Sequence, residues 1–386
     1  MNEMTPIQRL TRDLKNASAT LSDAEARFLV DSYYQMQDAR IRADGQVRSI
    51  EKNTKKGQEP EPHMVLSWLA EQNKSLENQI KRALEKYVDT HPVGSWLTSI
   101  HGIGPVISAG LLAHIDINKA PTVGHIWRFA GLDPTVQWRS RDFVQGFVKS
   151  ARENRDDWTA LVKMCRETNR RPLSMLHAAG MIETIPEPDI IRQFLSNKEH
   201  TKVVKAEFHA DNILKEALSD EKLPEAYAEL YPNLQFDWSS LTRTLSKRPW
   251  NAQLKVLCWK AGESFVKFHN DKKCFYGHIW KTQKELYIRR NEQLDYANRS
   301  GDILQAKRFN KATDAYKAYS EGKFPPAHIH AMARRYAVKL FLSHLHGEMY
   351  RRILKTEPPL PYPLAHLGHV DFIEPPVDLS ESSDDT

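Results

Sequence analysis

Two glycines, one residue apart and followed at once by a proline, precede an apolar helical pattern in SIHGIGPVISAGLLAHI, residues 99 to 115. Glycine adopts positive φ without steric cost and lets other atoms approach its backbone closely, which suits Gly102 and Gly104 to a tight turn. Proline favours the first position of a helix, so Pro105 predicts where the helix begins. Such a helix start carries unpaired backbone N–H groups and the positive end of the helix dipole. This spacing therefore favours the binding of phosphate.

A helix that ends at Ile100, before the turn, would complete a helix-hairpin-helix. That motif holds the DNA backbone without reading its sequence. The predicted backbone-binding residues of the turn are Gly102, Ile103, Gly104 and Val106. The alternative is an ordinary corner between two helices, in which the glycines only permit close packing. If the binding hypothesis holds, a bulky residue in place of Gly104 abolishes binding.

The elements that must position this turn are helices. Residues 1 to 50 have a helical pattern, in which Ser22 and Glu25 predict a capping box. A loop over 53 to 63 separates it from residues 64 to 88, whose leucines recur at three-to-four spacing. The pair predicts a helical hairpin or coiled coil, and we expect a homo-oligomer. Beyond the turn, a further helix should end at Gly131.

The chain shows no sustained β alternation, so the predicted fold class is all-α. We divide it by pattern and composition into a helical hairpin or coiled-coil region, the first half of a helical domain that carries the glycine turn, a helical insertion, the second half of that domain, and an acidic, proline-rich tail expected to be disordered. These five regions cover residues 1–94, 95–140, 141–240, 241–357 and 358–386.

Charge and cysteine usage narrow the function class. The chain has 386 residues, a net charge of +6 and an isoelectric point near 9.0. Its acidic tail has no Lys or Arg from Asp371 onward, so the rest is more basic than the whole, which suits a nucleic-acid binder. Three cysteines without CxxC spacing predict reduced thiols, with neither zinc nor a disulfide framework. Without a signal-type segment or a long apolar run, we expect a cytoplasmic protein with no membrane partner.

Three segments, in this order, resemble the carboxy-terminal domain of insertion-sequence-110 (116/902) family transposases. The first is WLTSIHGIGPVISAGLLAHI, followed by IWRFAGLDP, which is similar to the family's helix-hairpin-helix and the stop that trails it. The second is LSKRPWNAQLKVLCWKAGESF, and the third is KFPPAHIHAMARRYAVKLFLSHLHGEMY. The resemblance implies a protein of DNA transposition and recombination, with DNA and a structured guide RNA as partners.

The resemblance also implies a catalytic role for the second segment. The family's recombination nucleophile is a serine that aligns with Ser246. Attack of a serine hydroxyl on a phosphodiester leaves a covalent protein–DNA link. Lys247 and Arg248 beside it would neutralise the charge that builds up on phosphorus. The alternative is that Ser246 caps a helix N-terminus and its two basic neighbours only contact phosphate or solvent.

Two departures from the family pattern bear on catalysis. Pro249 stands where the family has a glycine, which removes backbone freedom and one N–H donor. The family also begins with a RuvC-like α/β domain whose four acidic residues bind magnesium, and this domain is predicted to be absent. Asp13, Asp23, Asp31 and Asp38 fall on helical patterns without β-runs to hold them. No cofactor is therefore expected, and a magnesium site is not supported.

Further basic residues extend the predicted interface. Arg128, Arg334 and Arg335 are expected to contact the DNA backbone, and the 276–290 segment mixes basic and aromatic residues in the same way. The histidine pairs at 328/330 and 344/346 invite a metal hypothesis. Residues two apart point to different sides of a helix, however, so polar-face or groove positions are favoured.

Two functions follow from the sequence. The first is a DNA-binding, transposase-like recombinase with Ser246 as nucleophile. The second is a non-catalytic nucleic-acid-binding protein of a mobile element or phage, derived from the same domain. A helical scaffold that assembles through residues 64 to 90 is a third possibility.

Overall fold

The computed structural model describes residues 11–53, 64–134, 138–153, 242–243, 246–360 and 372–376. Within these residues every regular element is a helix and no strand occurs, which confirms the all-α fold class. The chain divides into two compact units, residues 1–132 with 253–386 and residues 133–252. Most of the predicted insertion, and most of the acidic tail, lie outside the described residues.

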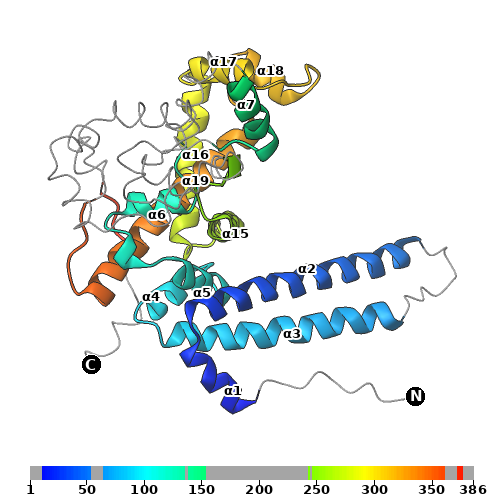
Figure 1. Ribbon diagram of the computed structural model, residues 1–386, viewed down its shortest axis with the longest axis vertical. Helices are drawn as coiled ribbons and strands as arrows, with labels where there is room; N and C mark the ends of the chain where they lie inside the picture. Colours follow the sequence, from blue (N-terminus) through cyan, green and yellow to red (C-terminus); the bar gives the residue numbers. More distant parts are fainter. Residues whose placement is uncertain are drawn as a thin grey trace. The chain divides into compact units, whose positions relative to one another are not determined.

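The described part of the first unit consists of helices joined by loops (Figure 1). They are α1 Arg12–Ala17, η1 Ser18–Thr20, α2 Asp23–Asn53, α3 Met64–Asp89, α4 Gly94–Ser99, α5 Pro105–His114, η2 Ile117–Lys119, α6 Val123–Phe129, α15 Ala252–Lys267 (its first residue in the second unit), α16 Phe275–Glu292, α17 Ala297–Ala306, α18 Asp314–Ser320, α19 Pro326–Met349 and the π-helical turn η4 Tyr350–Leu354. The second unit contributes α7 Arg141–Glu153.

Helices α2 and α3 form the predicted hairpin and lie side by side in Figure 1. The capping box is confirmed, because the Ser22 N–H donates to Glu25 Oε2 at 2.8 Å and the Glu25 N–H donates to Ser22 Oγ at 3.4 Å. The predicted helix over residues 1 to 50 is interrupted there, since η1 ends at Thr20 and α2 begins at Asp23. Between the two helices, Arg40 Nε lies 2.7 Å from Glu77 Oε2.

Helix α4 ends at Ser99 and α5 begins at Pro105, so the glycine turn lies between two helices, as both hypotheses for this segment require. Gly102 has φ +95°, a conformation that favours glycine. Its carbonyl accepts a hydrogen bond of 2.6 Å from Ser264 Oγ on α15, so the turn is fixed to a distant part of the chain. A side chain at Gly102 would also begin 3.0 Å from the same Ser264 oxygen. Backbone conformation and close packing both require glycine at this position.

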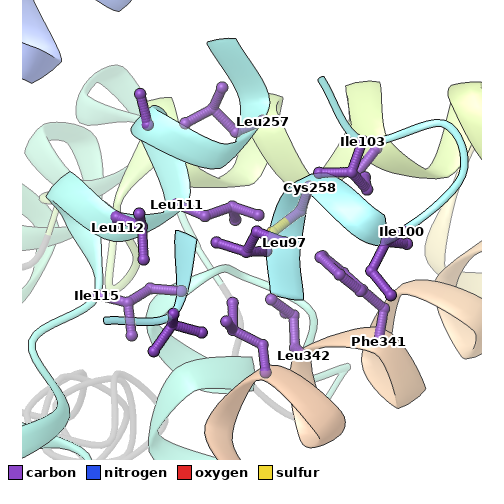
Figure 2. Close-up of a cluster of buried hydrophobic side chains, with 14 of the residues drawn as sticks. Leu97, Ile100, Ile103, Leu111, Leu112, Ile115, Leu257, Cys258, Phe341 and Leu342 are labelled. Carbon is purple, nitrogen blue, oxygen red and sulfur yellow. The ribbon is translucent and has the colours of Figure 1, made fainter. Parts of the chain in front are cut away.

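The turn sits on a core that α4, α5, α15 and α19 build together (Figure 2). Ile100 and Ile103, which flank the glycine, are 6% and 4% exposed and point into this core. Phe341 of α19 is fully buried and stacks on Trp96 of α4, with ring centroids 6.1 Å apart. The shape of the turn is therefore set by aromatic and aliphatic packing beneath it.

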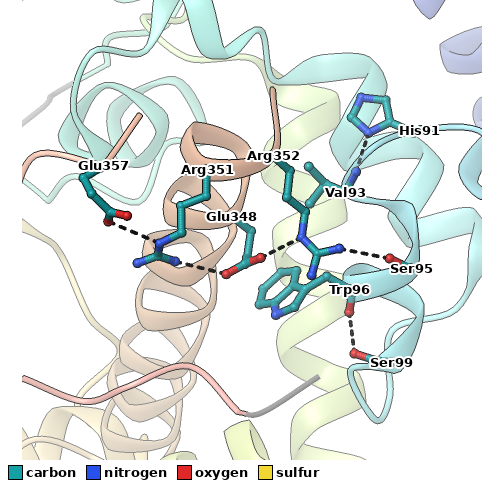
Figure 3. Close-up of polar contacts among 9 residues, drawn as sticks. All are labelled: His91, Val93, Ser95, Trp96, Ser99, Glu348, Arg351, Arg352 and Glu357. Carbon is teal, nitrogen blue, oxygen red and sulfur yellow. Dashed lines mark hydrogen bonds and ion pairs between the residues drawn. The ribbon is translucent and has the colours of Figure 1, made fainter. Parts of the chain in front are cut away.

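Polar contacts also join α4 to η4 and, through it, to Glu348 near the end of α19 (Figure 3). Arg352 donates through Nη1 to Ser95 Oγ at 3.2 Å and through Nε to Glu348 Oε2 at 2.9 Å. Arg351 lies 3.1 Å from Glu348 and 3.3 Å from Glu357.

Helix α6 ends as predicted, with Gly131 at φ +66°.

Three histidines of this unit are held neutral by burial. His346 is 2% exposed, with Nε2 2.9 Å from the Ala120 carbonyl oxygen. His344 is 6% exposed and contacts the Tyr276 hydroxyl and the Ile373 carbonyl oxygen, each at 2.8 Å. Burial lowers the pKa of both, and burial together with Arg27 lowers the pKa of His114 to about 4.

We expect these histidines to make the fold acid-sensitive. Below their ordinary pKa of 6.5 the unfolded chain binds more protons than the folded chain, so the free energy of unfolding falls as the pH falls. The urea midpoint, followed by circular dichroism, should be lower at about pH 5 than at about pH 7.5. A His346→Gln variant, whose amide still donates to Ala120, should show a smaller difference, and an unchanged difference would refute this explanation.

Candidate nucleic-acid interface

Helix α5 begins where the sequence predicts, directly after the glycine turn. Gly104 is the N-cap, with extended backbone at φ −95° and ψ 174°, and Pro105 is the first helical residue. Gly104 is exposed, and a Cβ placed on it would meet nothing within 4 Å. The first amides of a helix have no acceptor within the helix itself. Pro105 has no N–H, so the first such amides of α5 belong to Val106 and Ile107, beside the open backbone position at Gly104.

A pocket of about 310 Å³ lies beside this helix start. Tyr33 and Tyr34 of α2, Lys81 of α3 and Lys260 of α15 line it together with the first residues of α5. Three helices that are distant in sequence thus bring two lysines and two tyrosines to the glycine turn. The sequence offered no signal for this, because each lysine stands alone on a polar helical face.

The pocket is electropositive. The Lys260 ammonium lies 3.8 Å from the centroid of the Tyr34 ring, a cation–π contact that holds the charge in place. Burial raises the pKa of Tyr34 above its ordinary value and the pKa of Tyr33 to about 12, so both hydroxyls stay neutral. Among the described residues, no carboxylate forms an ion pair with Lys81 or Lys260. The two positive charges and the positive end of α5 act in the same direction.

The predicted turn residues divide into two roles. Gly104 is exposed at the mouth of the pocket, whereas Ile103 and Val106 are 4% and 6% exposed, with side chains in the core. Gly102 faces Ser264. Only backbone atoms of the buried residues are therefore candidates for contact with a phosphate.

Most basic residues of α19 and of the following turn η4 have partners within the protein. Arg334 pairs with Glu263 and lies 5.5 Å from the centroid of the Trp259 ring, and burial lowers its pKa. Lys339 lies over Trp127, and Arg351 and Arg352 share Glu348. Arg335 on α19 and Arg128 on α6 are both partly buried. Their contact with DNA stays a prediction.

The predicted catalytic residues belong to the second unit, whereas the glycine turn belongs to the first. They are Ser246, Lys247 and Arg248. The Ser246 hydroxyl donates to the Thr242 carbonyl at 2.8 Å and to the Arg243 carbonyl at 3.1 Å. Helix α15 begins only at Ala252, so Ser246 does not cap it, and the predicted alternative role of Ser246 as a helix N-cap is wrong. Lys247 and Arg248 are exposed.

Trp138 contacts both Ser246 and Arg248, and nothing in the sequence indicated these contacts. Its indole Nε1 donates to the Ser246 carbonyl at 2.9 Å, and the Arg248 guanidinium lies 5.2 Å from its ring centroid. These contacts join the residues just after the first family-like segment to the start of the second across more than a hundred residues.

The histidine pairs serve packing in this structure. His328 bonds the Tyr319 hydroxyl at 2.9 Å and stacks on Phe324, and His330 contacts the Trp280 ring. In the described part of the chain, no cluster of three or more His, Cys, Asp or Glu residues could hold a metal ion. Asp23 and Asp31 contact Tyr87 and Gln253. None of the described helices has the length and apolar character that crossing a bilayer requires.

The described residues thus form an all-α protein with a glycine turn at a helix start and a lysine-lined pocket beside it. Residues 94–139, which contain this turn, match the model of the Transposase IS116/IS110/IS902 family. The matched segment contains α4, the glycine turn, α5 and α6 and ends at Arg139, so the predicted resemblance is confirmed over these residues. No curated protein and no solved structure matches the chain.

Proposed function

We propose that this chain is a DNA-binding protein of transposition or recombination that holds the phosphate backbone at the start of α5. The observation that carries the proposal is that Lys81, Lys260 and the exposed Gly104 N-cap line one pocket. Gly104 belongs to the segment that matches the family model. A phosphate there would meet two ammonium groups and the first amides of a helix. Backbone contacts of this kind position a duplex and do not read its sequence.

The proposal extends to strand transfer through Ser246. Its Oγ would attack phosphorus, forming an Oγ–P bond while one P–O bond of the phosphodiester breaks and the departing DNA oxygen takes up a proton. The hydroxyl at present donates its hydrogen to backbone carbonyls, which leaves oxygen lone pairs for the attack. Lys247 and Arg248 would stabilise the charge on phosphorus. The family match, which ends at Arg139, supports transposition chemistry and does not reach Ser246.

A Lys81→Gln/Lys260→Gln variant tests the phosphate site. Loss of two phosphate contacts should weaken binding of duplex DNA roughly tenfold and reduce the slope of log affinity against log salt by about 2, equally for unrelated sequences. Fluorescence polarisation with labelled duplexes over a salt series measures both quantities.

The matched control replaces exposed lysines on the same two helices, Lys74→Gln/Lys267→Gln, outside the pocket. This control should bind almost as tightly as the unaltered protein. If both double variants lose the same affinity and slope, the pocket has no special role. If the unaltered protein binds neither DNA nor RNA at low salt, the helical scaffold becomes the better explanation.

The alternative function is a non-catalytic nucleic-acid-binding protein of a mobile element or phage. It shares the phosphate site and differs only at Ser246. Pro249 in place of the family's glycine favours it, because that proline removes an N–H donor beside the serine. The two functions make the same prediction for the lysine variants and opposite predictions for covalent trapping with DNA.

A further inference from the structure

Two exposed aromatic rings of the second unit each lie beside an arginine. Trp138 is 40% exposed and Phe143, on α7, is 50% exposed. The Arg248 guanidinium lies 5.2 Å from the Trp138 ring centroid, and the Arg139 guanidinium lies 5.3 Å from that of Phe143. We name these four residues with Lys247 the aromatic–basic patch. Each ring therefore has solvent-accessible surface beside a positive charge.

The patch is basic and partly preorganised. The described residues 138–143 and 246–248 include four basic residues and one acidic residue, which are Arg139, Arg141, Lys247, Arg248 and Asp142. The hydrogen bond from Trp138 Nε1 to the Ser246 carbonyl fixes the orientation of the indole. At the N-terminus of α7, the Phe143 N–H donates to Ser140 Oγ at 3.3 Å. Little conformational entropy would be lost on binding, since the indole is already oriented.

We infer that the aromatic–basic patch binds an unpaired strand of nucleic acid, with bases on the rings and phosphates at Lys247 and the arginines. The combination of cations and flat apolar rings matches the two chemical parts of a nucleotide, the phosphate and the base. In a duplex the base faces are covered by their neighbours, so an exposed ring reaches them only where the strand is unpaired. The inference goes beyond phosphate binding at α5 and does not depend on the chemistry of Ser246.

The test compares strands with and without bases. Labelled single strands of about 12 nucleotides, one DNA and one RNA of the same sequence, are titrated beside an abasic strand of equal length and charge. The unaltered protein should bind the strands with bases at least about fivefold more tightly than the abasic strand. The DNA and RNA arms show which of the two nucleic acids is preferred.

A Trp138→Leu/Phe143→Leu variant should lose this base-dependent difference while keeping its affinity for the abasic strand. Trp138→Phe, which keeps a ring but loses the N–H donor, should retain most of the difference. The matched control is Trp259→Leu, because Trp259 is 49% exposed and also lies beside an arginine, but belongs to the first unit. It should retain the difference in full.

Three results would overturn the inference: equal binding of abasic and normal strands by the unaltered protein, an unchanged difference in the double variant, or no binding of any strand. Circular dichroism of each variant separates loss of the patch from loss of the fold. Failure of the phosphate site at α5 would appear separately, as an unaltered salt slope of duplex binding in the Lys81→Gln/Lys260→Gln variant.

Discussion

Ser246→Ala should eliminate every covalent protein–DNA adduct while leaving affinity for duplex DNA unchanged. The substitution removes one oxygen whose visible role is to donate to the carbonyls of Thr242 and Arg243. Loss of such a hydrogen bond at a partly exposed site costs only about 1 kcal/mol of stability. The loss of the nucleophile is complete, because alanine has no atom that can attack phosphorus. Labelled DNA, with and without co-purifying RNA, followed by a denaturing gel, measures the adduct.

Ser99→Ala is the matched control for this experiment. Ser99 is exposed, and its hydroxyl donates to the Trp96 carbonyl at 2.8 Å, much as Ser246 donates to Thr242. Its alanine variant should form as much adduct as the unaltered protein. An adduct that persists in Ser246→Ala would place the nucleophile elsewhere. Bound DNA with no adduct in any variant would favour the non-catalytic function.

The sequence predicted those parts of the structure that depend on near neighbours. The Ser22–Glu25 capping box, the start of α5 at Pro105 and the end of α6 at Gly131 each need only a few consecutive residues. Local backbone preference decides them, and glycine and proline state that preference most clearly. The sequence did not predict the break between η1 and α2, because the residues on both sides of it are helical.

The candidate site was only half predictable, for a physical reason. The role of Gly104 is indicated by its neighbours in sequence, Gly102 and Pro105. Lys81 comes to the same pocket from α3, earlier in the chain, and Lys260 comes from α15, later in the chain. A lone lysine on a polar face has the same pattern whether it lines a pocket or faces solvent. Likewise, Trp138 follows a predicted helix stop, and only folding brings its indole to the Ser246 carbonyl.

Burial also changes what a basic or acid–base residue is available to do. Arg334 of α19 and Arg352 of η4 are both basic in sequence, yet Arg334 pairs with Glu263 and Arg352 with Glu348. His346, a metal candidate by type alone, bonds a backbone carbonyl in the core. Such partners come from other elements, so composition and periodicity along one helix do not reveal them.

Gly104→Asp should weaken duplex DNA binding at the α5 turn at least tenfold without destabilising the protein. Position 104 is a helix N-cap with extended backbone, where aspartate is among the most favourable residues, and its side chain would enter open space. The same carboxylate would occupy the anion position and satisfy Lys81 and Lys260 from within the chain. We expect duplex affinity to fall at least tenfold, about 1.4 kcal/mol, and the thermal midpoint to hold or rise.

Two further variants separate charge, shape and backbone at this turn. Gly104→Asn has nearly the shape and N-cap quality of aspartate without its charge, so it should bind considerably better than Gly104→Asp. Gly102→Val should instead lower the thermal midpoint, because valine is strained at φ +95° and begins 3.0 Å from Ser264 Oγ. If Gly104→Asp and Gly104→Asn bind equally well, phosphate does not bind at the start of α5. If the Gly104→Asp protein is stable but binds DNA poorly and the Gly104→Asn protein binds it well, the two differ only in side-chain charge. That result would show that the unaltered protein binds a phosphate at the start of α5.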